Sequence, residues 1–370
     1  MKESNAERIS DTAKSFRRKI RENVRSMDVY NVTSGDTISI KLNQNESPFD
    51  VPVAWKHEIL QRLESTEWNR YPTAHASLLR NALADHLGIE FDQVVVGNGS
   101  NDLAQSIVSA TVETGRNVVV PRPMFFLYEK LVKLAGGNVV PVESKPPHFQ
   151  FDVVDILSSI RKSDPCLTVL TTPNNPTGRE MAVADLREIV GATSGLVLID
   201  EAYFEFSDTG SLIELVHEYD NVIIMRTFSK AASLAGVRVG YFIAPPWLTE
   251  EILKVRLPFM VNAFSQSAAL TMIANEGWIC EKVQRLKESS LNLQRQVGQI
   301  PNVSVIPSVT NFFLFDGNRG AELIYSELSR QGILVRLMSS YPSLRRFLRI
   351  SVGTEAENRM FLSALLSILS

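Results

Sequence analysis

A series of short apolar runs, bounded by polar residues, constrains the fold of this chain most strongly. Continuous apolar runs of this length are typical of strands that are covered on both faces. Helical segments lie between most of them, and this alternation predicts a largely parallel α/β sheet between layers of helices. The predicted strands are Val94–Val96, Asn117–Val120, Val139–Val142, Leu167–Thr171, Leu196–Ile199 and Val222–Met225.

The segments on either side of this region follow other patterns. Apolar residues from Ile9 to Met27 recur at three- and four-residue steps, which predicts a single amphipathic helix. Leu78 to Leu87 predicts a helix that ends at Gly88. From about residue 263, helices near 264–298, 321–331 and 355 onward alternate with strands near 303–306, 311–315, 333–336 and 347–352, which indicates a smaller α+β domain. We therefore expect an N-terminal helix and arm over residues 1–45, a large domain over 46–262 and a small domain over 263–370.

Composition gives no support to several classes of function. The formal net charge of −3 gives no electrostatic reason to expect nucleic acid or an acidic membrane as a partner. No apolar run approaches the ~20 residues of a membrane span. The histidines are scattered without metal-ligand spacing, so no metal site is expected. Cysteines occur only at Cys166 and Cys280, which fits a reducing cytoplasm and no disulfide framework.

Polar motifs follow four of the predicted strands at the point where each strand ends. Gly99-Ser-Asn101, Pro173-Asn-Asn175, Asp200 and Thr227-Phe-Ser-Lys230 each come directly after, or shortly after, an apolar run. Ligands of open α/β sheets bind beyond the carboxyl ends of the strands. Taken singly, each motif is also explained as a turn, a loop or a surface lysine. Their common position predicts one binding site at this edge of the sheet.

These motifs and their order resemble those of fold-type I aminotransferases that depend on pyridoxal phosphate (PLP). The resemblance is closest to the histidinol-phosphate aminotransferase family, and it runs from about Tyr30 to the C-terminus. It implies a large domain with a mainly parallel seven-stranded sheet and a smaller α+β domain. It also implies a homodimer whose active sites lie at the subunit boundary.

The resemblance implies a role for each residue around the cofactor. Lys230 would bond to the cofactor's aldehyde carbon and later move the proton, Asp200 would pair with the pyridine nitrogen, and Tyr203 and Asn175 would bind the ring hydroxyl. An anion is favoured at the helix start after Gly99. The residues implied for the phosphate and for the ring face are Gly99, Ser100, Asn101, Thr227, Ser229 and Arg238, with Phe125 stacked on the ring and Tyr71 supplied to the partner subunit's cofactor.

Two arginines bear on the substrate. Arg349 matches the family's carboxylate clamp, and Arg336 matches the arginine that binds the phosphate of histidinol phosphate, although a surface charge at a strand edge also explains it. The resemblance further assigns Tyr30, Asn45 and Glu46 to the substrate side of the site. Phe125 replaces the tyrosine that is usual there, and Leu337 stands where a proline is common, so these departures concern the substrate rather than the cofactor.

The main hypothesis is transfer of an amino group from histidinol phosphate to 2-oxoglutarate in histidine biosynthesis. Two alternatives remain open from the sequence: an aminotransferase for aromatic amino acids, and a PLP-dependent decarboxylase of a phosphorylated amino acid of the threonine phosphate type. The partners expected are thus a small amino donor and a 2-oxo acid acceptor, with no nucleic acid and no membrane.

Overall fold

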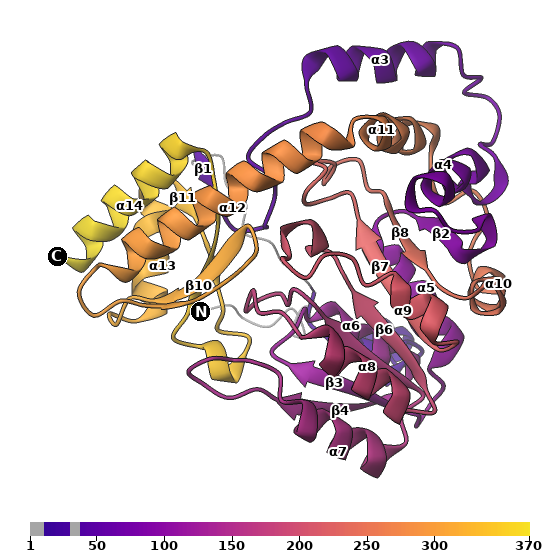
Figure 1. The fold of residues 1–370 in the computed structure, drawn as a ribbon. Coiled ribbons are helices and arrows are strands. Elements are labelled where there is room, and N and C mark those ends of the chain that lie inside the picture. The colour runs from indigo at the N-terminus through magenta and orange to yellow at the C-terminus, as the bar shows by residue number, and fades with distance from the viewer. Residues whose placement is uncertain (1–10, 30–37) are drawn as a thin grey trace.

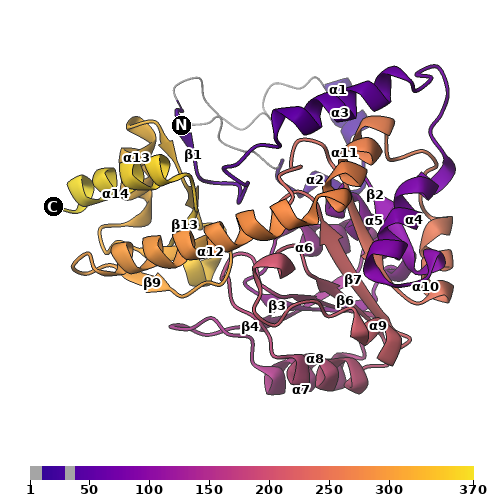
Figure 2. The same cartoon turned by 45° about the horizontal axis from the view of Figure 1, so that its top comes forward.

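The computed structural model describes residues 11–29 and 38–370. They form a large body and a smaller one, joined by a long helix that runs between them in both views (Figures 1 and 2). The core of the large body is a seven-stranded sheet. Its strands are β2 (Val94–Gly97), β3 (Asn117–Arg122), β4 (Asn138–Glu143), β5 (Leu167–Thr171), β6 (Leu196–Asp200), β7 (Val222–Thr227) and β8 (Gly240–Ile243).

The spatial order of this sheet is β2-β8-β7-β6-β5-β3-β4. Neighbouring strands are parallel except at β8, which is antiparallel to both β2 and β7. The six strands located from the sequence are confirmed, and β8 is the one that was not located. It is short and begins with a glycine, a residue that is depleted in strands.

Helices cover both faces of the sheet because alternate strand residues point to opposite sides. One face packs against α4 (Ser77–Leu87), α7 (Val153–Ser163), α8 (Val183–Ala192), α9 (Glu214–Glu218) and α11 (Ala263–Ala274). The other face packs against α5 (Ser100–Thr111), α6 (Leu127–Ala135) and α10 (Pro246–Lys254). The predicted stop of α4 is confirmed: Gly88 has φ 68°, a left-handed conformation that glycine adopts at low cost.

The small body has its own core. Its four-stranded antiparallel sheet has the order β12-β13-β10-β9. The elements are α12 (Glu276–Gly298), β9 (Ser304–Ile306), β10 (Phe312–Asp316), α13 (Ala321–Arg330), β11 (Ile333–Leu334), β12 (Arg336–Leu337), β13 (Leu348–Ser351) and α14 (Glu355–Leu369). Short β1 (Ile40–Lys41) pairs in parallel with β11, so the arm that precedes the large body adds a strand to the small one.

The N-terminal helix differs from its prediction. Among residues 11–29, the single expected helix is divided into α1 (Asp11–Arg17) and α2 (Glu22–Arg25). The apolar stripe does not find a core to cover, since Phe16 and Ile20 are exposed. Instead, Asn23 Nδ2 donates to the carbonyl of Lys133 at 2.8 Å, at the C-terminal end of α6. These polar contacts, rather than burial of one continuous face, position the segment.

The remaining elements complete the connections. α3 (Val53–Glu64) packs on α11, and 3₁₀ helices lie at Ala74–Ala76, Phe91–Gln93, Phe204–Phe206 and Pro342–Leu344. The domain boundary expected at residue 263 stays a prediction. Because α11 buries Ala268, Ala269 and Met272 in the core of the large sheet, we propose the junction of α11 and α12 as the dividing point. Within the described residues, no helix is both long and apolar enough to span a membrane.

Candidate active site

A cavity of about 870 Å³ lies where the carboxyl ends of the large sheet face the small body. It brings together residues from five strand ends, the arm after β1 and the small sheet. Most of the side chains predicted from the sequence line it. These are Asn45, Glu46, Ser100, Asn101, Phe125, Asn175, Asp200, Tyr203, Thr227, Ser229, Lys230, Arg238, Arg336 and Arg349.

One end of the cavity is built for an anion. Gly99 caps the N-terminus of α5 with φ 81°, and a Cβ atom at this position would lie 2.6 Å from Arg238 Nη2. Only glycine therefore lets the guanidinium reach the start of the helix. Arg238 Nη1 lies 3.4 Å from Ser229 Oγ, and Thr227 Oγ1 donates to the same hydroxyl at 3.0 Å. Backbone amides, hydroxyls and a guanidinium meet here, which is the donor set that a phosphate requires.

Lys230 occupies the middle of the cavity. Its Nζ donates to the carbonyl of Gln44 at 2.9 Å, a contact that the sequence did not indicate. Burial lowers the pKa of its amine to about 8, and the positive charges of Arg349 and Arg238 act in the same direction against Glu46 and Asp200. About a tenth of the amine is therefore neutral at pH 7, far more than for an ordinary lysine, and the neutral form is the one that acts as a nucleophile and takes up a proton.

Asp200 is buried at the end of β6, and its carboxylate is held at both oxygens. Oδ2 accepts a hydrogen bond from Tyr128 Oη at 2.5 Å, and Oδ1 accepts one from the amide of Ala202 at 2.9 Å. Burial raises the pKa of the Asp200 carboxyl, whereas the Tyr128 bond opposes that rise. Sequence reasoning missed Tyr128. It lies on α6, in a run where only Phe125 was given a role, and nothing in its spacing marks it.

Near Lys230, hydrogen bonds join the arm after β1 and the small body to the large body. Tyr203 Oη accepts from Asn45 Nδ2 at 2.9 Å, so its own hydrogen remains to be donated. Burial raises the pKa of Tyr203 to about 12. Arg349 Nη1 donates to Asn175 Oδ1 at 2.6 Å, and Nη2 donates to the carbonyl of Asn43 at 2.8 Å. Tyr203 and Arg349 are thus held by two separate sets of hydrogen bonds, and each set includes a residue of the arm after β1.

Arg336 and Arg349 stand directly opposite each other in the small sheet. They are register partners on the antiparallel strands β12 and β13, so their side chains leave the same face. Both line the cavity. Like charges placed opposite each other are destabilising unless an anion lies near them. The pair therefore brings two positive charges to the wall of the cavity that the small sheet forms.

Three predicted residues need separate mention. Tyr71 is 80% exposed and stacks on Phe259 with ring centroids 4.6 Å apart, outside the cavity of its own chain. Glu46 lines the cavity but its carboxylate is paired with Lys41 at 2.7 Å. Tyr30 lies outside the described residues.

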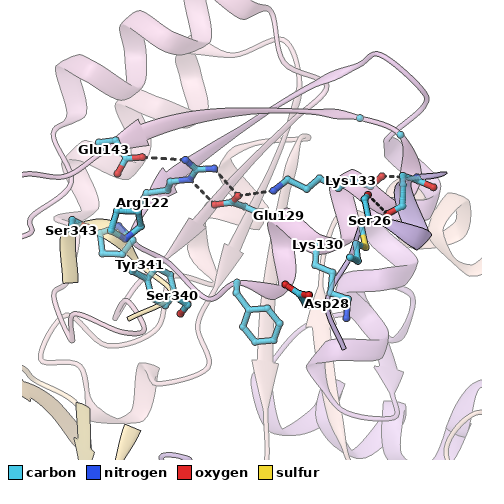
Figure 3. Close-up of a pocket in the computed structure, with 17 residues that line it drawn as sticks. Ser26, Asp28, Arg122, Glu129, Lys130, Lys133, Glu143, Ser340, Tyr341 and Ser343 are labelled. Carbon is cyan, nitrogen blue, oxygen red and sulfur yellow. Dashed lines mark hydrogen bonds and ion pairs between the residues drawn. The ribbon is translucent and has the colours of Figure 1, made fainter. Parts of the chain in front are cut away.

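A second cavity of about 1070 Å³ adjoins the first between α2, α6 and residues 340–343 (Figure 3). Its charges are largely paired: Arg122 donates to Glu129 at 2.6 Å and to Glu143 at 3.2 Å, and Lys133 lies 3.6 Å from Glu129. Although it is the larger of the two, it is lined by none of the site residues that were predicted from the sequence. The residues common to both cavities are Asp28, Phe126, Lys130, Ser340 and Tyr341.

The sequence profile of the family "Aminotransferase class I and II" matches residues 37–365. The chain belongs to this aminotransferase family. It is 36% identical over 341 residues to the histidinol-phosphate aminotransferase of Chlorobaculum tepidum, which covers 92% of this chain and 97% of the relative. The corresponding protein of Prosthecochloris aestuarii is 37% identical over 341 residues, 92% of this chain and 94% of the relative.

Solved structures agree with this assignment. The histidinol-phosphate aminotransferase of Sinorhizobium meliloti, determined with pyridoxal-5'-phosphate, superposes with a TM-score of 0.86 at 27% identity and covers 94% of this chain and 96% of that one. The L-threonine-O-3-phosphate decarboxylase of Porphyromonas gingivalis has a TM-score of 0.78 at 20% identity, over 89% of this chain and 99% of that one. At that identity, the second likeness shows the shared fold alone.

Membership of the aminotransferase family confirms the predicted fold class, the aminotransferase activity and PLP as the cofactor. The residues of this chain fit that cofactor. The space that a Cβ at Gly99 would fill is taken by the Arg238 guanidinium, the Asp200 carboxylate lies buried, and a lysine of lowered pKa lies between them. When bound, PLP serves as an electron sink for the carbon that bears the amino group.

Proposed function

We propose that this aminotransferase transfers the amino group of histidinol phosphate to 2-oxoglutarate in histidine biosynthesis. The observation that carries the proposal is the opposed pair Arg336 and Arg349 in the cavity. Histidinol phosphate has no carboxylate and carries a dianionic phosphate at its far end, so it needs a cationic subsite remote from Lys230. The names of the relatives from Chlorobaculum tepidum and Prosthecochloris aestuarii support the same substrate.

Each side chain around the cofactor has a separate role in this proposal. Lys230 Nζ would bond to the cofactor and then take and return the proton of the substrate carbon that bears the amino group. Asp200, held by Tyr128, would keep a proton on the ring nitrogen through its negative charge. Tyr203 Oη and the NH₂ of Asn175 would donate to the ring hydroxyl.

The two arginines would alternate between substrates. Arg349 presents two donors in one plane, which suits the carboxylate of 2-oxoglutarate and glutamate. Arg336 would bind the phosphate of the amine substrate. Phe125 lines the cavity beside the ring position, and its packing would hold the ring in place.

A half-reaction tests the substrate. The holoenzyme is mixed with histidinol phosphate without a 2-oxo acid, and the absorbance of the lysine-bound cofactor is followed. We expect prompt conversion to the amine form of the cofactor, with phenylalanine and tyrosine much slower. Fast conversion by phenylalanine or tyrosine but not by histidinol phosphate would show that the amino donor is an aromatic amino acid instead. Release of carbon dioxide from threonine phosphate, without conversion of the cofactor, would indicate a decarboxylase.

We further propose a homodimer in a reducing cytoplasm. Tyr71 and Phe259 form an exposed aromatic stack, and Trp68 and Leu257 near them in the chain are also exposed. Exposed aromatic side chains are enriched at protein–protein interfaces. Co-expression of Tyr71→Ala and Lys230→Ala chains tests shared sites. In mixed dimers, one of the two sites carries neither change, so activity should reappear; two inactive parents that never complement would contradict the proposal.

A further inference from the structure

The helix that would receive the cofactor phosphate carries a carboxylate in its first turn. Asp102 Oδ2 accepts a hydrogen bond from the backbone amide of Asn98 at 2.9 Å, which fixes the turn that leads to Gly99. A carboxylate at this position is favourable for the helix itself. For a dianionic phosphate at the same helix start, however, it is a like charge, and it competes for the same dipole.

Arg256 lies against this carboxylate from a separate segment. Its Nη2 donates to Asp102 Oδ2 at 3.0 Å and to the carbonyl of Val96 at 3.2 Å, and its Nη1 donates to Ser106 Oγ at 3.0 Å. The arginine side chain is only 3% exposed. One guanidinium thus joins the end of β2 to the first two turns of α5.

The surroundings leave Asp102 with Arg256 as its charged partner among the described residues. Of the nearby titratable groups, His75 has its pKa lowered, first by burial and then by the charges of Arg80 and Arg256. A neutral His75 adds no positive charge at neutral pH. Arg80 instead donates to the carbonyls of Val94 and Phe91, at the other end of β2.

We propose that Arg256 is a positioning residue for the cofactor phosphate: it cancels the charge of Asp102 while Asp102 holds the turn that shapes the phosphate cradle. Removal of the arginine leaves an uncompensated carboxylate at the helix start. The Asp102 carboxylate then repels the phosphate, and the turn before α5 loses its hydrogen-bonded link to β2. The inference rests on family membership and on PLP, and it is independent of which amine the enzyme uses.

The test is a double-mutant cycle in which the affinity for the cofactor, rather than the turnover rate, is measured. Cofactor-free Arg256→Met, Asp102→Asn and the double variant are titrated with pyridoxal phosphate and with pyridoxal, which lacks the phosphate. Binding is followed by quenching of tryptophan fluorescence. We expect Arg256→Met to weaken the binding of pyridoxal phosphate about tenfold or more, which is the scale of one hydrogen bond to a charged group. The affinity for pyridoxal should stay nearly unchanged. Adding Asp102→Asn should restore much of the loss.

Arg80→Met is the matched control, because it removes a buried arginine that is hydrogen-bonded to the same strand but not to a carboxylate. We expect it to lower the melting temperature without favouring pyridoxal over pyridoxal phosphate. If Arg256→Met does not fold, Arg256→Lys, which keeps the charge but loses the forked donors, is compared with Asp102→Asn alone. Equal loss for both ligands, or no recovery in the double variant, would overturn the proposal.

Discussion

Replacement of Tyr128 by phenylalanine tests how the site keeps a buried carboxylate ionised. Tyr128 is 1% exposed, and its hydroxyl donates to Asp200 Oδ2 at 2.5 Å. Phenylalanine keeps the ring, so the packing against Leu131 and Val132 is retained. The change therefore removes one hydrogen bond to a charged group and little else.

The magnitude follows from that single bond. A hydrogen bond to a charged group contributes about 1.5–3 kcal/mol. At about 1.36 kcal/mol for each factor of ten, this corresponds to a roughly 10- to 150-fold slower half-reaction, if the whole bond supports the ionised carboxylate. Because Tyr128 opposes the rise in the pKa of Asp200 that burial causes, its loss raises this pKa further. Asp200 acts as an anion, so the defect should grow as the pH falls.

The assay is the single-turnover half-reaction across a pH series, together with the melting temperature of each variant. Tyr219→Phe is the matched control, since Tyr219 packs against the large core away from the cavity. We expect the control to keep the wild-type rate and pH profile. A Tyr128→Phe enzyme with the wild-type rate at every pH would refute the role given to this hydroxyl.

Two further predictions concern the cofactor end of the cavity. Gly99→Ala should weaken binding of pyridoxal phosphate by at least about tenfold, since its Cβ would lie 2.6 Å from Arg238 Nη2 at φ 81°. Gly88 has a similar φ of 68°, but an added Cβ there would have nothing within 4 Å, so Gly88→Ala should lower stability and leave cofactor binding intact. Equal affinities of the two variants for pyridoxal phosphate would contradict the role given to Gly99. The rate at which cofactor-free protein bonds to the cofactor should rise with pH and be half-maximal near pH 8, because only the neutral Lys230 amine attacks. Arg349→Met should move that midpoint upward, and an unchanged stopped-flow midpoint would count against the electrostatic argument.

Much of the fold was predictable because it depends on local patterns. The strand that ends at Asp200 is a continuous apolar run, and Gly88 stops α4 by its own backbone preference. β8 and the break between α1 and α2 were not predictable in the same way. The first is a short strand that relies on its neighbours, and the second depends on carbonyls of α6, far away in the chain.

The site residues also fall into those that local sequence patterns predict and those that depend on packing between distant segments. Lys230 and Asp200 were identifiable because each comes at or shortly after the end of a predicted strand, and Arg238 because of its position after Lys230 in the motif that resembles the family's. Tyr128 and Arg256 act through other residues, and their positions depend on how α5, α6 and the segment after α10 pack. The carbonyl of Gln44 that receives Lys230 is a backbone group, which no side-chain pattern reveals.

The central claim is that the opposed arginines select a phosphorylated amine. The most direct measurement compares histidinol phosphate with histidinol in the half-reaction, for the wild type and for Arg336→Gln. The wild type should strongly prefer the phosphorylated amine, and the variant should lose roughly 10- to 150-fold of that preference, the scale of one charge-assisted hydrogen bond. Reaction of glutamate should be far less affected. A preference that survives in Arg336→Gln, or its absence in the wild type, would contradict the account.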